Sequence, residues 1–502
     1  MADLDRRSFV KSVAGTLALP ALSSSAQEHQ QPSPLNANPR RESSRPPNVI
    51  VMICDDLGYG DLGCYGSHLN TPNLNRMAGE GVRFLRFNTA HPVCSVSRAA
   101  WLTGRYATRS HVEDAYMPGA QGGMDLSEKT LADILKPRGY KSMCIGKWHL
   151  GEQSQYLPPN RGFDAFFGVP YSDDMNPLPL IRDLTAIEPD TDRALLTPRY
   201  TEEAVKFIES SAAHPFFLWV AYSYPHDPAR ASGMFAGKSA HGPYGDAVEE
   251  IDWSASEILA AVSRNHLDED TIVIFTSDHG PWYQGSPGLL RGRKHTTYEG
   301  GTRLPFIARW SGTIPAGKVV NTWGSNLDLV PTIASICGAP LSANPVDGID
   351  ITNLLAGRGN PPERGTILYF MDGAVECARK GSWKLRVSLH PAETDGFEGG
   401  TNRTGPVPYF FANPELYNLD NDPTESYNVA HANPAVVKEI LGDIEALMPT
   451  FPDEVVKAYT AQRANLDSQL TPSGAAPRPA NFTPDPRIFD PPRGDYGSLK
   501  GS

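Results

Sequence analysis

An apolar run that ends abruptly in two aspartates is the feature that most constrains this chain. Residues 48–54 read NVIVMIC, and Asp55 and Asp56 follow directly. A short, continuous apolar run is typical of a strand that is buried on both faces, and such strands belong mainly to parallel sheets. Because parallel strands need long crossovers, the run predicts that strands alternate with helices along the chain.

The chain up to about residue 360 follows that alternation. Further buried strands are expected at 140–145, 216–222 and 271–276, and helices at 73–80, 126–138, 201–211 and 245–265. The pattern predicts an α/β fold with a large, mostly parallel sheet between helices, joined by right-handed crossovers.

The pattern changes after about residue 360. Short strand-like runs at 367–371, 375–379 and 383–387 lie close together, and a helix is expected near 435–448. They predict a smaller C-terminal domain with an antiparallel sheet and a helix. We therefore expect a signal peptide and flexible leader over 1–47, a large domain over 48–360, the smaller domain over 361–455 and a surface tail over 456–502, which is rich in Pro, Asn and Asp.

The first residues resemble a twin-arginine export signal. Arg6 and Arg7 precede an apolar run at 13–22, and small residues follow at 24–26. The run is too short to span a bilayer, and we expect no membrane span in the mature chain. We therefore expect export to the periplasm or the cell exterior. A disordered basic N-terminus and anchoring by an uncleaved leader remain open alternatives.

The overall charge argues against one class of partner. The chain of 502 residues has a formal net charge of -12. Because nucleic acids are bound by basic surfaces, we expect no nucleic-acid partner. An anionic substrate would need a locally basic pocket.

Two of the predicted strands end in carboxylates. Asp55 and Asp56 follow the first strand, and Asp278 and His279 follow the run TIVIFTS. Functional groups gather beyond the carboxyl ends of parallel strands, and three carboxylates there would repel one another without a cation. A hard divalent metal ion with oxygen ligands is the simplest partner. The open alternative is that these residues cap loops and helices.

Other predicted strand-end loops carry lysine or histidine. These residues are Lys147 and His149 in GKWHLG, His226 in PHDP and Lys294 in RKH. Singly, each is more often a solvated surface charge or a hydrogen-bonded core histidine. Together with a metal, they would form a pocket for a tetrahedral anion such as a sulfate or phosphate ester.

Cys94 precedes a helix-compatible stretch at 99–105. It is therefore expected at or near a helix N-terminus, where unpaired amides and the helix dipole favour an anion. The six cysteines show neither a CxxC pattern nor a dense disulfide framework. A buried structural cysteine is the open alternative.

Taken together, these motifs resemble the type I sulfatases of the alkaline phosphatase superfamily. The resemblance covers residues 48 to about 385 and rests on DDLGYGDLG, TPNL, the Cys94 segment, GKWHLG, TSDHG and residues 294–303, in family order. It implies an alkaline phosphatase-like fold in which 48–360 is the catalytic domain.

The resemblance also implies a mechanism. In this family a formylglycine-generating enzyme oxidises the cysteine, and the formylglycine hydrate attacks sulfur and expels the alcohol. Asp55, Asp56, Asp278, His279 and the modified Cys94 would be metal ligands, and Arg98 would orient residue 94 and the metal. Lys147 and His149 would bind the hydrate and help to eliminate sulfate. Lys147, His226 and Lys294 would bind the substrate, and the last two would also assist the leaving oxygen.

Two positions depart from the family pattern. Val96 stands where the family motif C-x-P-S-R has proline, which belongs to the signal read by the formylglycine-generating enzyme, so conversion of Cys94 is open. His279 stands where many members have asparagine. Calcium is the first expectation for the metal, and magnesium, manganese or another divalent ion remains open.

The leading hypothesis is hydrolysis of aryl or carbohydrate sulfate esters. The alternatives are a phosphodiester or phosphonate monoester hydrolase of the same superfamily, and a catalytically silent binder of sulfated glycans if Val96 prevents conversion of Cys94. Loops at 172–192, 229–241 and 393–411 are expected to select the alcohol. Trp282, Tyr283 and Tyr409 are either sugar-stacking residues or ordinary packing aromatics.

Overall fold

The computed structural model of the chain describes residues 45–358, 363–389, 409–464 and 466–467. The predicted export signal and most of the predicted tail lie outside these ranges. No helix within them is both long enough and apolar enough to cross a membrane.

The large sheet has eleven strands in the order β10-β2-β9-β8-β1-β7-β3-β4-β5-β6, with β11 beside β2. Strand β1 pairs in parallel with β7 on one side and with β8 on the other. Strand β9 is antiparallel to both β2 and β8, and β5 is antiparallel to β4 and β6. The strand bounds are β1 Asn48–Cys54, β2 Val82–Asn88, β3 Lys141–Lys147, β4 Ala165–Val169, β5 Leu180–Arg182, β6 Thr185–Glu188, β7 Phe216–Ala221, β8 Thr271–Ser277, β9 Arg303–Arg309, β10 Lys318–Val320 and β11 Gly324–Ser325.

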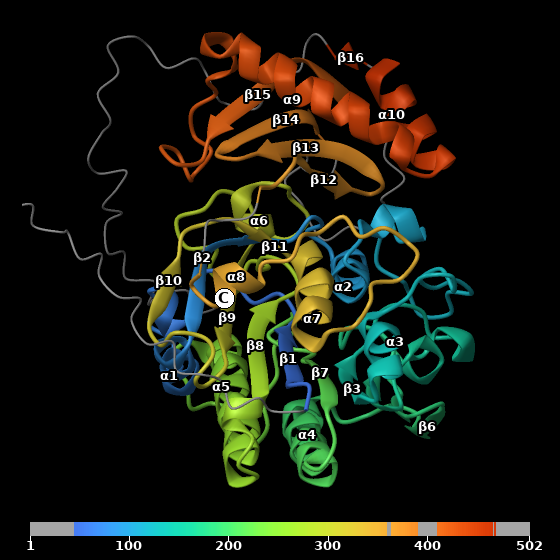
Figure 1. Cartoon of the computed structure of the whole chain (residues 1–502), viewed down its shortest axis with the longest axis vertical. Helices are drawn as coiled ribbons and strands as arrows, with labels where there is room; N and C mark the ends of the chain where they lie inside the picture. The colour runs from blue at the N-terminus through green and yellow to red at the C-terminus, as the bar shows by residue number, and fades with distance from the viewer. Residues whose placement is uncertain (1–44, 359–362, 390–408, 465, 468–502) are drawn as a thin grey trace, which may run out of the picture. The chain divides into compact units, whose positions relative to one another are not determined.

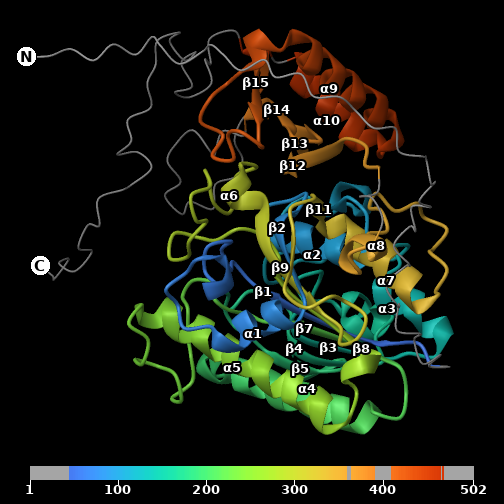
Figure 2. The ribbon, with the colours of Figure 1, turned by 60° about the vertical axis from the view of Figure 1, so that its left-hand side comes forward.

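Helices cover both faces of this sheet (Figures 1 and 2). Alternate side chains of β1 point to opposite faces: Val51 packs in one core with α2, α3 and α7, whereas Met52 packs in another with α1, α4 and α5. The helix bounds are α1 Pro72–Glu80, α2 Cys94–Thr103, α3 Leu131–Leu135, α4 Leu196–Ser211, α5 Gly242–Arg264, α6 Glu299–Thr302, α7 Leu329–Cys337 and α8 Thr352–Leu355. The predicted fold class, a large and mostly parallel sheet between helices, is confirmed.

A smaller sheet follows, in the order β12-β13-β14-β15-β16. Its first four strands are antiparallel neighbours, and Figure 1 shows α9 and α10 lying across one face. Leu385, Ile440 and Tyr459 share the core between the sheet and these helices. The bounds are β12 Ile367–Met371, β13 Ala374–Lys380, β14 Trp383–Leu389, β15 Tyr409–Asn418, β16 Leu466–Asp467, α9 Pro434–Leu447 and α10 Asp453–Ala464.

Two elements differ from the sequence-based expectation. The helix predicted over 126–138 begins only at Leu131, because Thr130 and Asp133 form a capping box that fixes its start. The surface tail predicted from residue 456 is wrong over its first residues, because α10 continues to Ala464. Val455 and Tyr459 are buried in that helix, one turn apart, so this stretch belongs to the small core.

Candidate active site

Parallel strands of the large sheet end at a common edge. Cys54 at the end of β1 lies beside Ser277 of β8. Ala221 at the end of β7 lies between Ile53 of β1 and Gly146 of β3. The residues that follow these strands therefore meet beyond one edge of the sheet.

The predicted metal ligands converge at this edge. One ligand atom each from Asp55, Cys94, Asp278 and His279 lies within 4.8 Å of the other three. Asp56 joins them, because its Oδ1 lies 3.4 Å from His279 Nε2. All five side chains are buried. The structure thus brings together residues that are more than 180 positions apart in sequence.

Arg98 and Lys147 supply positive charge to this cluster. Arg98 Nη2 lies 3.3 Å from Asp55 Oδ1 and 3.0 Å from Asp278 Oδ2. Lys147 Nζ lies 2.5 Å from Asp55 Oδ2. Arg98 also donates to the Lys147 carbonyl at 2.9 Å. The Arg98 guanidinium therefore links residues at the ends of three strands, β1, β3 and β8.

Lys294 and His226 approach from the other side of the cluster. Lys294 Nζ donates to both carboxylate oxygens of Asp56, at 2.9 and 3.0 Å. His226 Nε2 lies 3.9 Å from Asp56 Oδ2. Both side chains are largely buried, so each is held in place beside the carboxylates.

The electrostatics of the aspartates fit a binding site for a divalent cation. Burial favours the neutral form of Asp55, but Lys147 and Arg98 outweigh it and hold its pKa well below the ordinary value. Burial raises the pKa of Asp278 to about 7, with His279 as the largest opposing charge. No described residue donates a hydrogen bond to Asp55 Oδ1. A hard cation would satisfy that buried oxygen and add positive charge beside Asp278.

Cys94 is the first residue of α2, and it is buried. Its Sγ lies 3.2 Å from His279 Nε2. Burial and Asp55 favour the thiol, but Lys147, Lys294 and His279 outweigh them and lower the pKa of Cys94 to about 6. The helix N-terminus and these cations make residue 94 a position that stabilises an anion.

His149 lies beside the same cluster in a left-handed backbone conformation, with φ of 60°. Its Nε2 lies 3.0 Å from the Tyr116 carbonyl, and Nδ1 has no hydrogen-bond partner among the described residues. Burial, followed by Lys147 and Arg98, holds the pKa of His149 well below its ordinary value. The imidazole is therefore neutral at neutral pH and can accept a proton at Nδ1.

Comparison with known proteins identifies the family. A family model described as sulfatase matches residues 47–339, more than half of the chain. The chain belongs to the sulfatase family. Arylsulfatase A of Homo sapiens is 36% identical over 501 residues, covering 88% of this chain and 96% of that protein. N-acetylgalactosamine-6-sulfatase of Canis lupus familiaris is 38% identical over 433 residues, covering 78% of this chain and 83% of that protein.

A solved structure agrees with this assignment. The PsFucS1 sulfatase from Pseudoalteromonas sp. is 27% identical, with a TM-score of 0.72 over 84% of this chain and 92% of that chain. This sulfatase is therefore a sulfuric ester hydrolase with the alkaline phosphatase-like fold.

Two polar residues that follow β4 were predicted only as part of the alcohol-selecting loop at 172–192, and not as neighbours of Lys147 and His226. Ser172 Oγ accepts a hydrogen bond from Lys147 Nζ at 2.9 Å. Asp173 Oδ1 lies 3.3 Å from His226 Nδ1. The signal was the same as for the other clusters, an apolar run (AFFGV) followed by polar residues, but the short strand was not predicted.

The aromatic candidates have different surroundings. Tyr283 is 59% exposed, and its ring meets that of Trp282 edge-on at 4.8 Å between centroids. Trp282 also packs edge-on against His295, the residue after Lys294. The side chain of Tyr409 lies outside the described part of the chain. Tyr283 is thus the exposed ring of the pair, close in sequence to Asp278 and His279.

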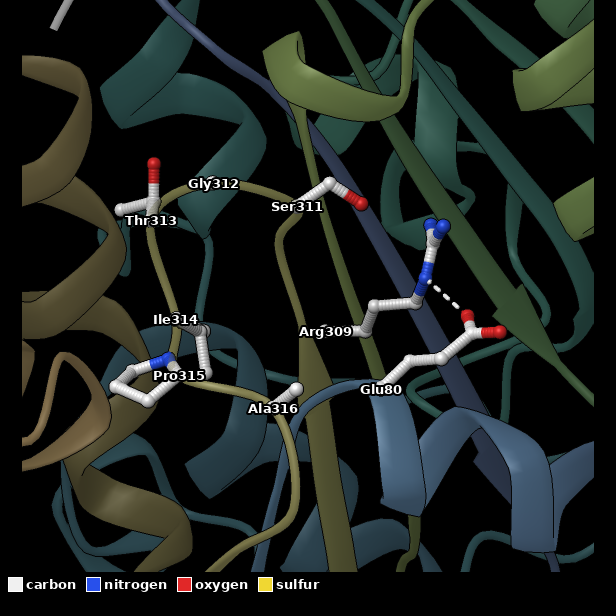
Figure 3. Close-up of a pocket in the computed structure, with 8 residues that line it drawn as sticks. All are labelled: Glu80, Arg309, Ser311, Gly312, Thr313, Ile314, Pro315 and Ala316. Carbon is white, nitrogen blue, oxygen red and sulfur yellow. Dashed lines mark hydrogen bonds and ion pairs between the residues drawn. The ribbon is translucent and has the colours of Figure 1, made fainter. Parts of the chain in front are cut away.

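A surface pocket of about 510 Å³ lies away from this cluster (Figure 3). It is lined by Glu80, Arg309 and residues 311–316. Arg309 ends β9, which is antiparallel to β8, so the pocket lies at the opposite edge of the sheet from Asp278. Its arginine is paired with Glu80 at 2.8 Å. The pocket holds none of the predicted site residues.

Proposed function

We propose that this sulfatase hydrolyses aryl or carbohydrate sulfate esters. It would use a formylglycine nucleophile derived from Cys94, and it would bind a divalent metal, for which calcium is the first expectation. The main support for the proposal is the position of Cys94. It lies close both to carboxylates that can bind a metal and to cationic side chains that can bind a sulfate. When formed, the formylglycine hydrate supplies the nucleophilic oxygen. The proposal requires a formylglycine-generating enzyme as a partner during maturation.

Asp55, Asp56, Asp278 and His279 would hold the metal together with residue 94. The carboxylates are the oxygen donors that calcium prefers, whereas the imidazole also suits other divalent ions. A metal bound here would stabilise negative charge on the sulfate oxygens.

Lys147, Lys294 and His226 would bind the sulfate group. With Asp55 and Asp56 engaged as metal ligands, the two ammonium groups direct N–H donors at the sulfate oxygens. Arg98 keeps Asp55 and Asp278 in position. Neutral His149 would bind the formylglycine hydrate together with Lys147 and help to eliminate sulfate, with Nδ1 as the ring nitrogen that has no hydrogen-bond partner among the described residues.

Turnover of matched esters tests the proposal against its alternatives. The expected order of kcat/KM is 4-nitrophenyl sulfate first, with bis(4-nitrophenyl) phosphate and 4-nitrophenyl phenylphosphonate slower. The sulfatase relatives support this order. Much faster cleavage of either phosphorus ester would favour the phosphodiester or phosphonate hydrolase. Binding of a sulfated glycan without turnover of any ester would favour the silent binder.

Val96 is predicted to limit the conversion of Cys94. The first amide bonded within α2 is that of Ser97, to the Val93 carbonyl, so proline at 96 removes no helical hydrogen bond. Val96→Pro should raise the formylglycine fraction, measured by mass spectrometry, and raise kcat per molecule in proportion. Val96→Ala is the control and should leave the fraction unchanged. An unchanged fraction in Val96→Pro would show that the valine is not limiting.

A carbohydrate sulfate is the favoured substrate class. The name N-acetylgalactosamine-6-sulfatase, carried by a relative, and the exposed Tyr283 support it. Export by the twin-arginine route to the periplasm or the cell exterior is part of the proposal. It rests on Arg6, Arg7 and the apolar run at 13–22, which lie outside the described residues. Because that route exports folded protein, Cys94 can be modified before export.

A further inference from the structure

Asp173 is a buried carboxylate that lies against the His226 imidazole. The residue is 1% exposed, and His226 is the hydrogen-bonding partner and largest counter-charge of its carboxylate within the described residues. Burying a carboxylate is costly unless it is paired, so a group of this kind needs an explanation. Burial raises the pKa of Asp173, and His226 is the largest opposing influence.

His226 is the counter-charge that lies against Asp173. Its Nδ1 lies 3.3 Å from Asp173 Oδ1. The other ring nitrogen, Nε2, lies 3.3 Å from Ser172 Oγ and 3.9 Å from Asp56 Oδ2. The imidazole thus has one nitrogen on Asp173 and the other directed at the carboxylate cluster.

We propose that Asp173 is a positioning residue that holds His226 by Nδ1, so that Nε2–H faces the leaving oxygen of the ester. The inference rests on the proposed function, in which His226 assists that oxygen. When the sulfur–oxygen bond breaks, its electron pair stays on the bridging oxygen. The Nε2 proton then moves to that oxygen and gives the alcohol, while Nδ1 keeps its proton against Asp173.

Loss of the carboxylate should leave the ring free to turn. The chain supplies no other hydrogen-bond partner for His226 Nδ1 among the described residues. A turned ring would present a carbon atom to the leaving oxygen, and proton transfer would slow. A carboxylate that fixes an imidazole in this way works through the ring and does not take the proton itself.

Leaving groups of different basicity test the role of Asp173. A 4-nitrophenolate leaves readily without a proton, whereas phenolate needs one. Asp173→Asn should lower kcat for phenyl sulfate by about 100-fold and for 4-nitrophenyl sulfate by about 5-fold, with KM changed by less than about twofold. In the His226→Gln background, Asp173→Asn should lower neither rate further. If Asp173→Asn does not fold, Asp173→Ser replaces it, and the same difference between the two sulfates is expected.

Asp174 provides the matched control. It is the next residue along and is exposed, and its carboxylate lies within 4.8 Å of the Asp173 and His226 ligand atoms. Asp174→Asn should change both rates by less than about twofold, because it leaves the contact between Asp173 and His226 in place. An equal loss in Asp174→Asn would overturn the assignment to Asp173.

Two further results would overturn the inference. Equal losses on both sulfates in Asp173→Asn would mean that Asp173 acts on structure alone. Loss of a metal equivalent in Asp173→Asn, measured by elemental analysis, would make Asp173 a metal ligand. A wild-type enzyme that turned over neither sulfate would instead contradict the proposed function itself.

Discussion

Asp278→Ala is expected to remove the bound metal and to lower kcat for 4-nitrophenyl sulfate by about a thousandfold. Asp278 is fully buried at the end of β8, and its carboxylate shares the cluster with Asp55, Cys94 and His279. Alanine would remove an oxygen ligand and also release Arg98, which donates to Asp278 at 3.1 Å. Elemental analysis and steady-state kinetics on the same preparation measure both effects.

Asp227→Ala is the matched control for this substitution. Asp227 is exposed at the same edge of the sheet, where it accepts a hydrogen bond from Gln284 at 2.7 Å. It is not in the metal cluster, so metal content should be unchanged and kcat should fall by less than about threefold. Full metal content together with normal turnover in Asp278→Ala would refute the proposed ligand set.

Lys384→Met should destabilise the folded protein by about 3–5 kcal/mol. The Lys384 side chain is completely buried in β14, and its Nζ lies 3.1 Å from Glu299 Oε1 and 3.0 Å from Glu425 Oε1. Glu299 begins α6, five residues after Lys294. Methionine fills nearly the same space, so the loss comes from two buried carboxylates that no longer share an ammonium group. The urea midpoint of unfolding measures the change.

Lys380→Met is the matched control in the same sheet. Lys380 pairs with Glu439 and Asp443 at 2.8 Å each, but its side chain is 38% exposed. Exposed ion pairs contribute little, so the expected loss is much smaller than that of Lys384→Met. Adding Glu425→Gln to Lys384→Met should restore part of the stability, because Glu425 loses its ammonium partner, whereas Glu299 keeps its ion pair with Arg303. Equal effects of Lys384→Met and Lys380→Met would contradict the importance of burial.

The buried cluster of Asp55, Cys94, Asp278 and His279 could be predicted from the sequence because parallel strands end together. The runs before Asp55 and Asp278 are continuous and apolar, and both form full-length buried strands, β1 and β8. Neighbouring strands then fix which loops meet, so Lys147 and His226 were placed correctly without any contact being known. The chemistry of the cluster follows from that topology.

Two strands that contain proline could not be predicted from the local sequence pattern. Strand β9 carries Pro305, which argues against an interior strand, yet β9 pairs on both sides with antiparallel partners. Strand β15 carries Pro414 and pairs with β14 across a register shift. In both strands the proline lies at a register shift, where it removes no regular ladder hydrogen bond, and the local sequence pattern does not reveal that shift.

The contact between Asp173 and His226 was also invisible in the sequence. The two residues follow different strands, β4 and β7, which lie on either side of β3. Only the strand order brings their loops together, and β4 was not predicted. Helix α10 was missed for a related reason, since its few apolar residues are recognisable only against the small core that they complete.

The most direct test of the account is the mass of the tryptic peptide that carries residue 94. Cleavage after Arg86 and Arg98 releases residues 87–98, FNTAHPVCSVSR. In protein with sulfatase activity, a fraction of this peptide that matches the active fraction should be about 18 Da lighter than the cysteine form, as formylglycine requires. Fully active protein in which the peptide carries only unmodified cysteine would contradict the account.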